Sequence, residues 1–102
     1  MEKTTQFCAI LSIRYLNAHL MGPAHDWAAQ NLTDMPDGVS AVRSFHVAPD
    51  RGLTIVWFDT QEQLDAGYSG LVEFQNEIAK RFEAKTESRK GITSSEYDFG
   101  QP

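Results

Sequence analysis

The stretch that decides the fold is residues 39–64, which read VSAVRSFHVAPDRGLTIVWFDTQEQL. Its first nine residues alternate between two sides, and residues 53–58 (LTIVWF) are β-branched, aromatic or otherwise apolar, so both segments are predicted as strands. The turn sequence PDRG at residues 49–52 joins them into an antiparallel hairpin. Thr60 followed three residues later by Gln63 is a capping-box pattern, which predicts that a helix begins directly after the hairpin.

The segment that follows the hairpin is predicted to be helical from about Gln61 to Lys85. Gly67 and Gly70 lie inside it, and glycine disfavours the helix interior, so we expect a kink or break near Tyr68 to Gly70. Gly91 then ends the helical region. The last strand is expected at Ile92–Phe99.

The segment before the hairpin contains one strand and one short helix. Phe7–Leu16 (FCAILSIRYL) is predicted as a central strand, because its odd-numbered side is wholly apolar and its even-numbered side is mixed. Pro23 is well placed for a helix start, so we expect a helix from Ala24 to about Asp34.

The resulting order is β-α-β-β-α-β, which predicts one α+β domain over residues 1–102 with the ferredoxin-like arrangement. In this fold two helices cover one face of a four-stranded antiparallel sheet. The third strand carries large apolar residues on both sides, Ile55 and Trp57 on one and Val56 and Phe58 on the other. We therefore expect a homodimer that pairs through the uncovered sheet face, with a partly wetted monomer as the alternative.

Composition excludes several classes of function. The chain has 9 Lys and Arg against 14 Asp and Glu, a net charge of -5, which argues against a nucleic-acid partner. Cys8 is the single cysteine, so the chain can form neither an internal disulfide nor a paired-thiolate zinc site. Residues 1–6 are polar and no run of about 18 apolar residues occurs, so we expect a cytoplasmic protein with no membrane partner.

Two segments, Gly38–Phe45 and Leu53–Leu64, resemble the dimeric α+β barrel superfamily, in particular the antibiotic biosynthesis monooxygenase-like domains. The shared features are a Gly at the entry to the second strand, an aromatic residue at the end of the third, and a Leu that opens the second helix. The resemblance implies a dimeric barrel and a cofactor-independent monooxygenase that acts on an aromatic or polyketide-like small molecule. The alternative is a non-catalytic dimeric barrel that binds a small apolar ligand or serves a stress-related role.

The sequence departs from this family at one position. The His that the family often carries three residues after the helix-opening Leu falls on Gly67. Residues 61–90 also contain no His, so haem cleavage of the kind found in haem-degrading relatives is not expected. The departure favours the non-catalytic alternative.

Three polar residues on the predicted strands are candidates for catalysis. His46 shares a strand face with Val42 and Ser44, and a His among apolar neighbours can act as a base near neutral pH or serve as a structural hydrogen-bonding group. Arg14 and Arg43 lie on otherwise apolar strands. They either recognise an anionic or phenolate oxygen, pair with an acid such as Glu96 or Asp98, or lie at the rim of the dimer.

Four aromatic residues are predicted to contact a substrate: Tyr15, Trp57, Phe58 and Tyr68. Because strand residues alternate between faces, these residues and the three catalytic candidates cannot all line one cavity. His19, His25 and Asp26 could meet as metal ligands, but no HExxH motif or facial triad is present, so surface or capping roles are expected and no metal site is predicted.

Overall fold

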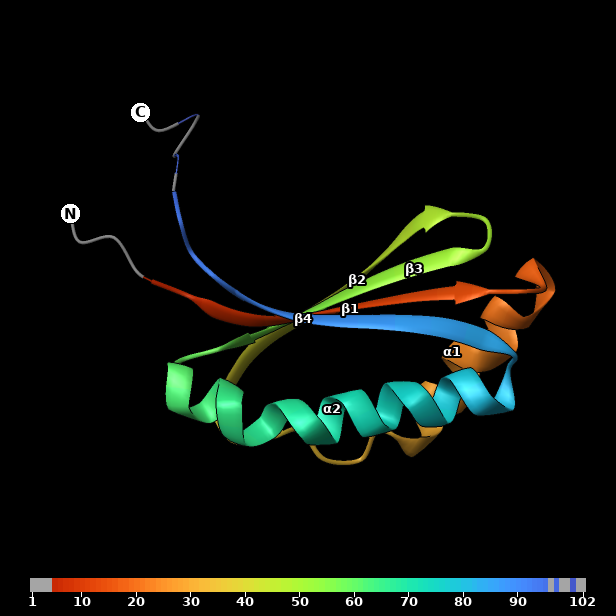
Figure 1. The fold of residues 1–102 in the computed structure, drawn as a ribbon, viewed down its shortest axis with the longest axis horizontal. Helices are drawn as coiled ribbons and strands as arrows, with labels where there is room; N and C mark the ends of the chain where they lie inside the picture. Colours follow the sequence, from red (N-terminus) through yellow and green to blue (C-terminus); the bar gives the residue numbers. More distant parts are fainter. Residues whose placement is uncertain (1–4, 96, 98–99, 101–102) are drawn as a thin grey trace.

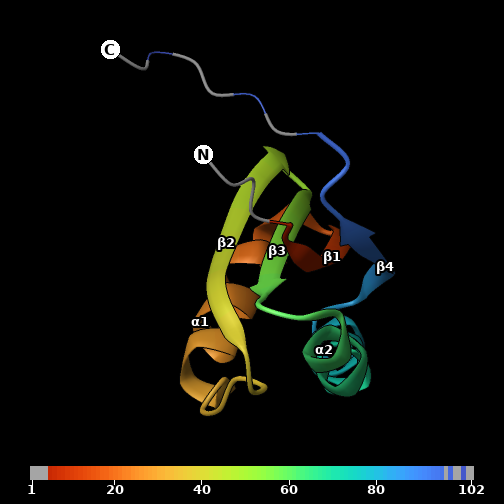
Figure 2. The same ribbon diagram turned by 90° about the vertical axis from the view of Figure 1, so that its left-hand side faces the viewer.

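The computed structural model describes residues 5–95, 97 and 100. Four strands form one antiparallel sheet in the order β2-β3-β1-β4, and both helices lie on the same side of it (Figures 1 and 2). The ferredoxin-like α+β class is therefore confirmed. The elements are β1 (Phe7–Tyr15), a 3₁₀ turn (Ala18–Leu20), α1 (Met21–Asn31), β2 (Val39–Ala48), β3 (Arg51–Phe58), α2 (Gln61–Arg81) and β4 (Ala84–Ile92).

β1 is a central strand, as its two apolar-containing faces predicted. It pairs with β3 on one side and with β4 on the other, and Phe7 is opposite both Phe58 and Ile92. Ala9 and Leu11 are buried beneath the helices. Alternate residues of β1 face the other side of the sheet, which no element of the described chain covers (Figure 1).

We call that side the open face. The register of the three strand pairs places alternate residues of each strand on it. Its residues are Cys8, Ile10, Ser12 and Arg14 of β1, Ala41, Arg43 and Phe45 of β2, Leu53, Ile55 and Trp57 of β3 together with Arg51 at its start, and Lys85, Glu87, Arg89 and Gly91 of β4. Val47 lies where the register of β2 shifts, and it lines a hollow on this face with Arg14 and Arg51.

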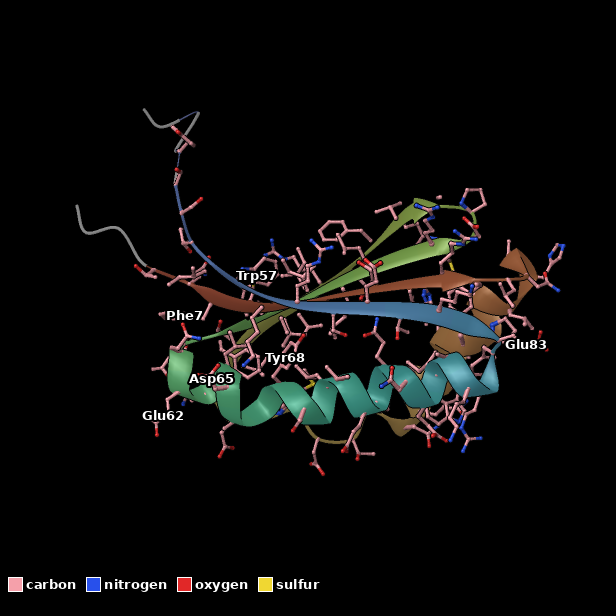
Figure 3. The ribbon with its side chains drawn as sticks, viewed as in Figure 1. Phe7, Trp57, Glu62, Asp65, Tyr68 and Glu83 are labelled. Atoms are coloured by element: carbon pink, nitrogen blue, oxygen red, sulfur yellow. The ribbon has the colours of Figure 1, made fainter. Side chains whose placement is uncertain are left out.

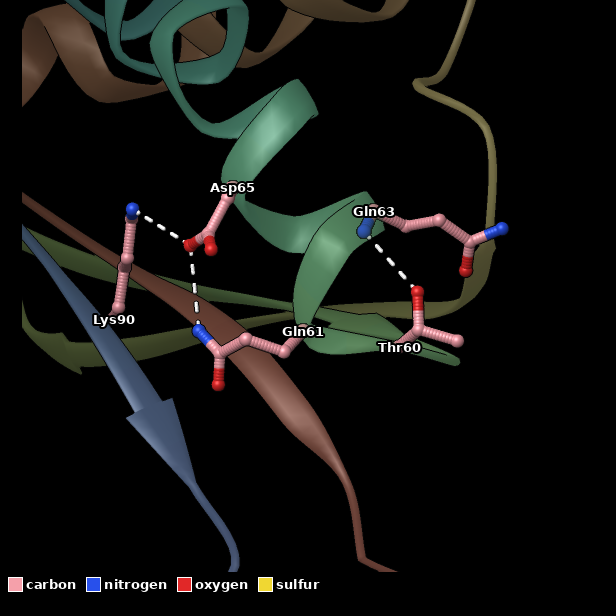
Figure 4. Close-up of polar contacts among 5 residues, drawn as sticks. All are labelled: Thr60, Gln61, Gln63, Asp65 and Lys90. Carbon is pink, nitrogen blue, oxygen red and sulfur yellow. Dashed lines mark hydrogen bonds and ion pairs between the residues drawn. The ribbon is translucent and has the colours of Figure 1, made fainter.

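The start of α2 follows the predicted capping pattern in part. The Thr60 hydroxyl accepts a hydrogen bond from the Gln63 backbone N–H at 3.1 Å (Figure 4). The Gln63 side chain does not complete the box: it lies against Gly38, which has a φ of 85°. A side chain at position 38 would be strained by this φ and would collide with Gln63, so the glycine is required there.

α2 is one continuous helix through Gly67 and Gly70, so of the predicted kink or break the break is wrong. A Cβ at Gly67 would lie 2.6 Å from the Pro36 Cβ and 3.2 Å from a ring carbon of Phe58. Gly67 therefore permits the close approach of the helix to the loop before β2 and to the sheet. The helix tolerates the two glycines because its apolar side is buried against the sheet.

The C-terminal elements also differ from the prediction. α2 ends at Arg81 rather than Lys85, and the last strand is Ala84–Ile92 rather than Ile92–Phe99. The chain reverses at Glu83, which has a φ of 52°, a left-handed conformation in which glycine is the usual residue. The expected strand residues 96, 98 and 99 lie outside the described residues.

α1 begins and ends three residues earlier than predicted, at Met21 and Asn31. Trp27 holds it to α2: the indole stacks on the Phe74 ring at 5.5 Å and meets the Phe82 ring edge-on at 6.4 Å. The main core lies between α2 and the sheet, at the end of the sheet away from α1. It consists of Ala9, Leu11, Val56, Phe58, Leu64 and Leu71.

Candidate functional site: a cavity between the sheet and the helices

A cavity of about 240 Å³ lies between the covered face of the sheet and the two helices. Its lining is mostly apolar and comes from every strand except β4 and from both helices. The lining residues include Tyr15, His25, Leu32, Val42, Phe74 and Gln75. An apolar hollow with a few polar groups is the usual form of a small-molecule site.

The cavity opens between α1 and the edge strand β2. Leu32 and Val42 line it and are 40% and 41% exposed. His25 of α1 also lines it, and the His25 ring meets the His46 ring of β2 edge-on, with centroids 5.3 Å apart. Two imidazoles from different elements thus stand at the mouth, where they can exchange protons with solvent.

Tyr15 supplies a phenol to the cavity wall. The residue is 2% exposed, and burial raises the pKa of its hydroxyl above the ordinary value, so the phenol is protonated at neutral pH. Nothing in the described part of the chain hydrogen-bonds to this hydroxyl. It is therefore a proton donor available to an oxygen atom of a bound molecule.

Gln75 forms a rigid polar part of the lining. It is 5% exposed, its Nε2 donates to the Ser12 carbonyl at 2.7 Å, and its Oε1 accepts from the Ser88 hydroxyl at 2.9 Å. These bonds join α2 to β1 and β4. Because both amide atoms are engaged, Gln75 holds the sheet and helix together rather than binding a ligand.

The predicted site residues on the covered face fall into two groups. Tyr15 lines the cavity, and His46 stands at its mouth through its contact with His25. Phe58 and Tyr68 lie in and against the main core at the other end of the sheet. The ammonium group of Lys90 lies 4.9 Å from the centre of the Tyr68 ring.

The other three predicted residues, Arg14, Arg43 and Trp57, are on the open face. Figure 3 shows Trp57 on the opposite side of the sheet from Tyr68. The guanidinium carbon of Arg43 lies 5.8 Å from the centre of the Trp57 ring, a cation–π contact. As the alternation of strand residues predicted, the seven candidates do not share a cavity.

His25 is the site residue that the sequence interpretation missed, because it was assigned a surface or capping role. A signal for it was present: His25, Ala28 and Leu32 recur at helical spacing, and all three line the cavity. Its partner His46 lies 21 positions away on another element, so only the folded structure could show their contact.

The structure provides no metal cluster among the residues that it describes, since no three His, Cys, Asp or Glu side chains come together there. His19, His25 and Asp26 accordingly do not form a ligand set. Within the same part of the chain, no helix is long and apolar enough to cross a membrane.

No protein-family model matches the sequence, and no curated protein is similar to it. Solved structures share its fold. A dimeric ferredoxin-like protein from an uncultured marine organism is 15% identical, with a TM-score of 0.69 over 92% of both chains. A protein of unknown function from Nitrosomonas europaea is 10% identical, with a TM-score of 0.68 over 98% of this chain and 100% of the other.

SnoaB from Streptomyces nogalater, a cofactor-independent oxygenase, is 7% identical, with a TM-score of 0.60 over 94% of this chain and 98% of its own. At these identities the similarity concerns the fold. The chain thus has the ferredoxin-like fold that both dimeric proteins and a cofactor-independent oxygenase use, and the resemblance found in the sequence is confirmed at that level.

Proposed function

We propose that the protein is a small oxygenase that uses no cofactor and oxidises an aromatic or polyketide-like molecule held in the cavity. The observation that carries the proposal is the apolar cavity with the Tyr15 phenol in its wall and His25 and His46 at its mouth. SnoaB supports the reaction type, because it is a cofactor-independent oxygenase with the same fold.

In this proposal the substrate supplies all the electrons. An imidazole of the His25–His46 pair removes a proton from an acidic carbon or phenol of the substrate, and the resulting anion reduces O₂ directly. For an activated methylene group, one oxygen atom becomes a carbonyl and the other leaves as water with the two methylene hydrogens. The Tyr15 hydroxyl donates a hydrogen bond to the oxyanion of the substrate, and the apolar walls strengthen that bond by excluding water.

Oxygen uptake tests the proposal, with a panel of anthrones and naphthols as probes and no cofactor added. We expect His25→Ala to lower the rate about 100-fold or more, as removal of a general base does. Tyr15→Phe is expected to lower it about 100-fold through loss of the oxyanion donor. His46→Ala should also lower the rate, because His46 contacts His25.

His19→Ala is the matched control, since His19 does not line the cavity. It is expected to keep the wild-type rate. Unchanged turnover of a genuine substrate by His46→Ala would remove His46 from the mechanism. Unchanged turnover by both His25→Ala and Tyr15→Phe would contradict the proposed site. Arg14 and Arg43 take no part in this chemistry, because they lie on the open face.

The second candidate is a dimeric barrel that binds a small apolar ligand without turnover. Gly67 favours it: the family that the sequence resembles often carries a His at this position, whereas in this chain Pro36 and Phe58 leave no space for a side chain there. Under this alternative the same probes bind, with quenching of tryptophan fluorescence, but no oxygen is consumed. Oxygen uptake that depends on Tyr15 would exclude it.

We further propose that the protein is a homodimer in which two open faces meet. Phe45 and Val47 of that face are 45% and 57% exposed, beside the partly buried Ile10, Ile55 and Trp57. An apolar sheet face of this kind is commonly covered by a second copy, and the marine ferredoxin-like protein with this fold is dimeric.

Sedimentation velocity tests the dimer. Phe45→Asp is expected to shift the protein to the monomer, because it places a charge among the exposed apolar side chains of the open face. Ile92→Asp is the control: Ile92 is 59% exposed, but its register with Phe7 puts it on the covered side. Equal effects of the two variants, or a monomeric wild type, would contradict this mode of pairing.

A further inference from the structure

The open face carries an unusual concentration of positive charge for an acidic protein. Among the described residues it holds five of the nine Lys and Arg of the chain and one carboxylate, that of Glu87. Arg43 lies over Trp57, and Arg89 pairs with Glu87 at 3.8 Å. The remaining three, Arg51, Arg14 and Lys85, form what we call the basic row.

The basic row crosses three neighbouring strands. Arg14 of β1 is directly opposite Arg51 of β3 and directly opposite Lys85 of β4, so all three side chains leave the same face at the same level. The row lies at the end of the sheet where β1 ends and β3 and β4 begin, on the right in Figure 1. Neighbouring Cα atoms in a sheet are about 5 Å apart, so the row spans about 10 Å.

Like charges directly opposite each other destabilise a sheet, and the Glu87 carboxylate, which pairs with Arg89, offsets the three cations of the row only in part. None of the carboxylates that the structure describes forms an ion pair with Arg14, Arg51 or Lys85. The three side chains line a hollow of about 570 Å³, whose other polar lining residues are Ser12, Thr86 and Glu87. The row therefore carries three positive charges beside one carboxylate that Arg89 already engages, so it has an excess of positive charge that an external anion can balance.

A second copy of the chain does not supply that anion when the two open faces meet. In a two-fold dimer the same patch occurs on both sides, so the facing surface brings the same excess of cations and again only Glu87 as an acid. Two arginines and a lysine on one line match a phosphate group, since Arg binds two of its oxygens at once and Lys adds a point charge.

We propose that the basic row is a binding site for a phosphate-type anion. A single phosphate reaches two neighbouring cations, whereas a diphosphate reaches all three, so the site favours a ligand that carries a diphosphate. The site is on the opposite side of the sheet from the cavity, so it stands independently of the proposed oxygenase activity.

Calorimetric titration of the full chain with inorganic pyrophosphate and with inorganic phosphate, at constant ionic strength in chloride, tests the site. We expect pyrophosphate to bind with a dissociation constant of about 1 mM or below, and phosphate more weakly. Absence of pyrophosphate binding, or equal affinity for the two anions, would overturn the proposal.

Arg14→Gln removes the middle cation and is expected to weaken pyrophosphate binding about tenfold or more. Arg89→Gln is the matched control, because it makes the same charge change on the same face outside the row. It should change the affinity by less than about threefold. An equal loss in the two variants would show a general field of positive charge rather than a site.

Thermal unfolding gives a second readout, in which the effect of one substitution changes sign. In chloride alone Arg14→Gln should raise the midpoint temperature, since it removes two like-charge contacts. With saturating pyrophosphate the wild type should become the more stable protein, because the anion stabilises the state that binds it. A lower midpoint for Arg14→Gln under both conditions would contradict the proposal.

Glu96 and Asp98, which lie outside the described residues, are two further carboxylates of this chain. The double variant Glu96→Gln, Asp98→Asn is expected to bind pyrophosphate as the wild type does. Tighter binding by this variant would show that these carboxylates occupy the row, and it would contradict the proposal that an external anion is the partner of the row.

Discussion

The two faces of the sheet are made from alternate residues of the same four strands, yet they reach different states. On the covered face Ala9, Val56 and Phe58 are at most 1% exposed. On the open face Phe45 and Val47 are 45% and 57% exposed. In the described part of the chain both α-helices lie on one side of the sheet, so they cover one face and leave the other open (Figure 2).

This difference separates the functions that we propose for the two faces. The covered face has a closed core at one end and a cavity at the other, where α1 is held by Trp27 but stands away from the edge strand. The open face offers an apolar centre for a second copy and a basic row for an anion. A small molecule and a partner can therefore bind on opposite sides of one sheet.

Substitution of two adjacent aromatic residues gives the sharpest test of the difference between the two faces. Phe58→Ala removes a fully buried ring and should lower the free energy of unfolding by about 3–5 kcal/mol. Trp57→Ala, one residue earlier on the open face, should cost the monomer less, because Trp57 is only partly buried. Chemical denaturation in dilute solution measures both losses, and equal losses would contradict the distinction.

Two glycines of α2 test how tightly the covered side is packed. Gly67→Ala should lower the free energy of unfolding by about 1–3 kcal/mol, since the new methyl group would meet Pro36 and Phe58. A Cβ at Gly70 would have no other atom within 4 Å, so Gly70→Ala should raise it by about 0.5–1 kcal/mol. Chemical denaturation measures both changes in the free energy of unfolding. Changes of the same sign in the two variants would show that α2 is not tightly packed against Pro36 and Phe58 at Gly67.

Removal of two ion pairs of β4 is expected to have the smallest effect on stability. On the covered side Lys90 donates to the Asp65 carboxylate at 2.9 Å, with a further hydrogen bond from Gln61 (Figure 4). The hydrogen bond from Lys90 is the main cause that holds the pKa of Asp65 below its ordinary value, with Gln61 second. On the open face Arg89 and Glu87 are 3.8 Å apart and more exposed.

A carboxylate with a lowered pKa in the folded state stabilises the protein above its unfolded pKa and loses that effect as the pH falls through the folded value. Asp65→Asn should therefore make the fall in midpoint temperature between about pH 6 and about pH 3 less steep, by a small amount because the pair is exposed. Glu87→Gln should leave that slope unchanged. A steeper slope for Asp65→Asn would contradict the assignment.

The features that the sequence predicted well are those in which neighbouring residues carry the signal. The two faces of β1, the hairpin of β2 and β3, and the Thr60 cap each depend on a few consecutive side chains. The last strand was misplaced because Ala84–Ile92 (AKTESRKGI) is rich in helix-forming and charged residues and no glycine marks the turn at Glu83. Its strand conformation comes from pairing with β1 and from contacts with α2, such as the Ser88–Gln75 bond.

By itself, the sequence determined the class of fold, the alternation of the strands and the excess of apolar surface on a second sheet face, because periodicity and turn chemistry are local properties. Only the tertiary structure decided which residues meet. It joined His25 to His46, buried the Tyr15 phenol in a cavity wall, and aligned Arg51, Arg14 and Lys85 in one row. These arrangements depend on strand register and helix placement, which are set by packing between segments far apart in the chain.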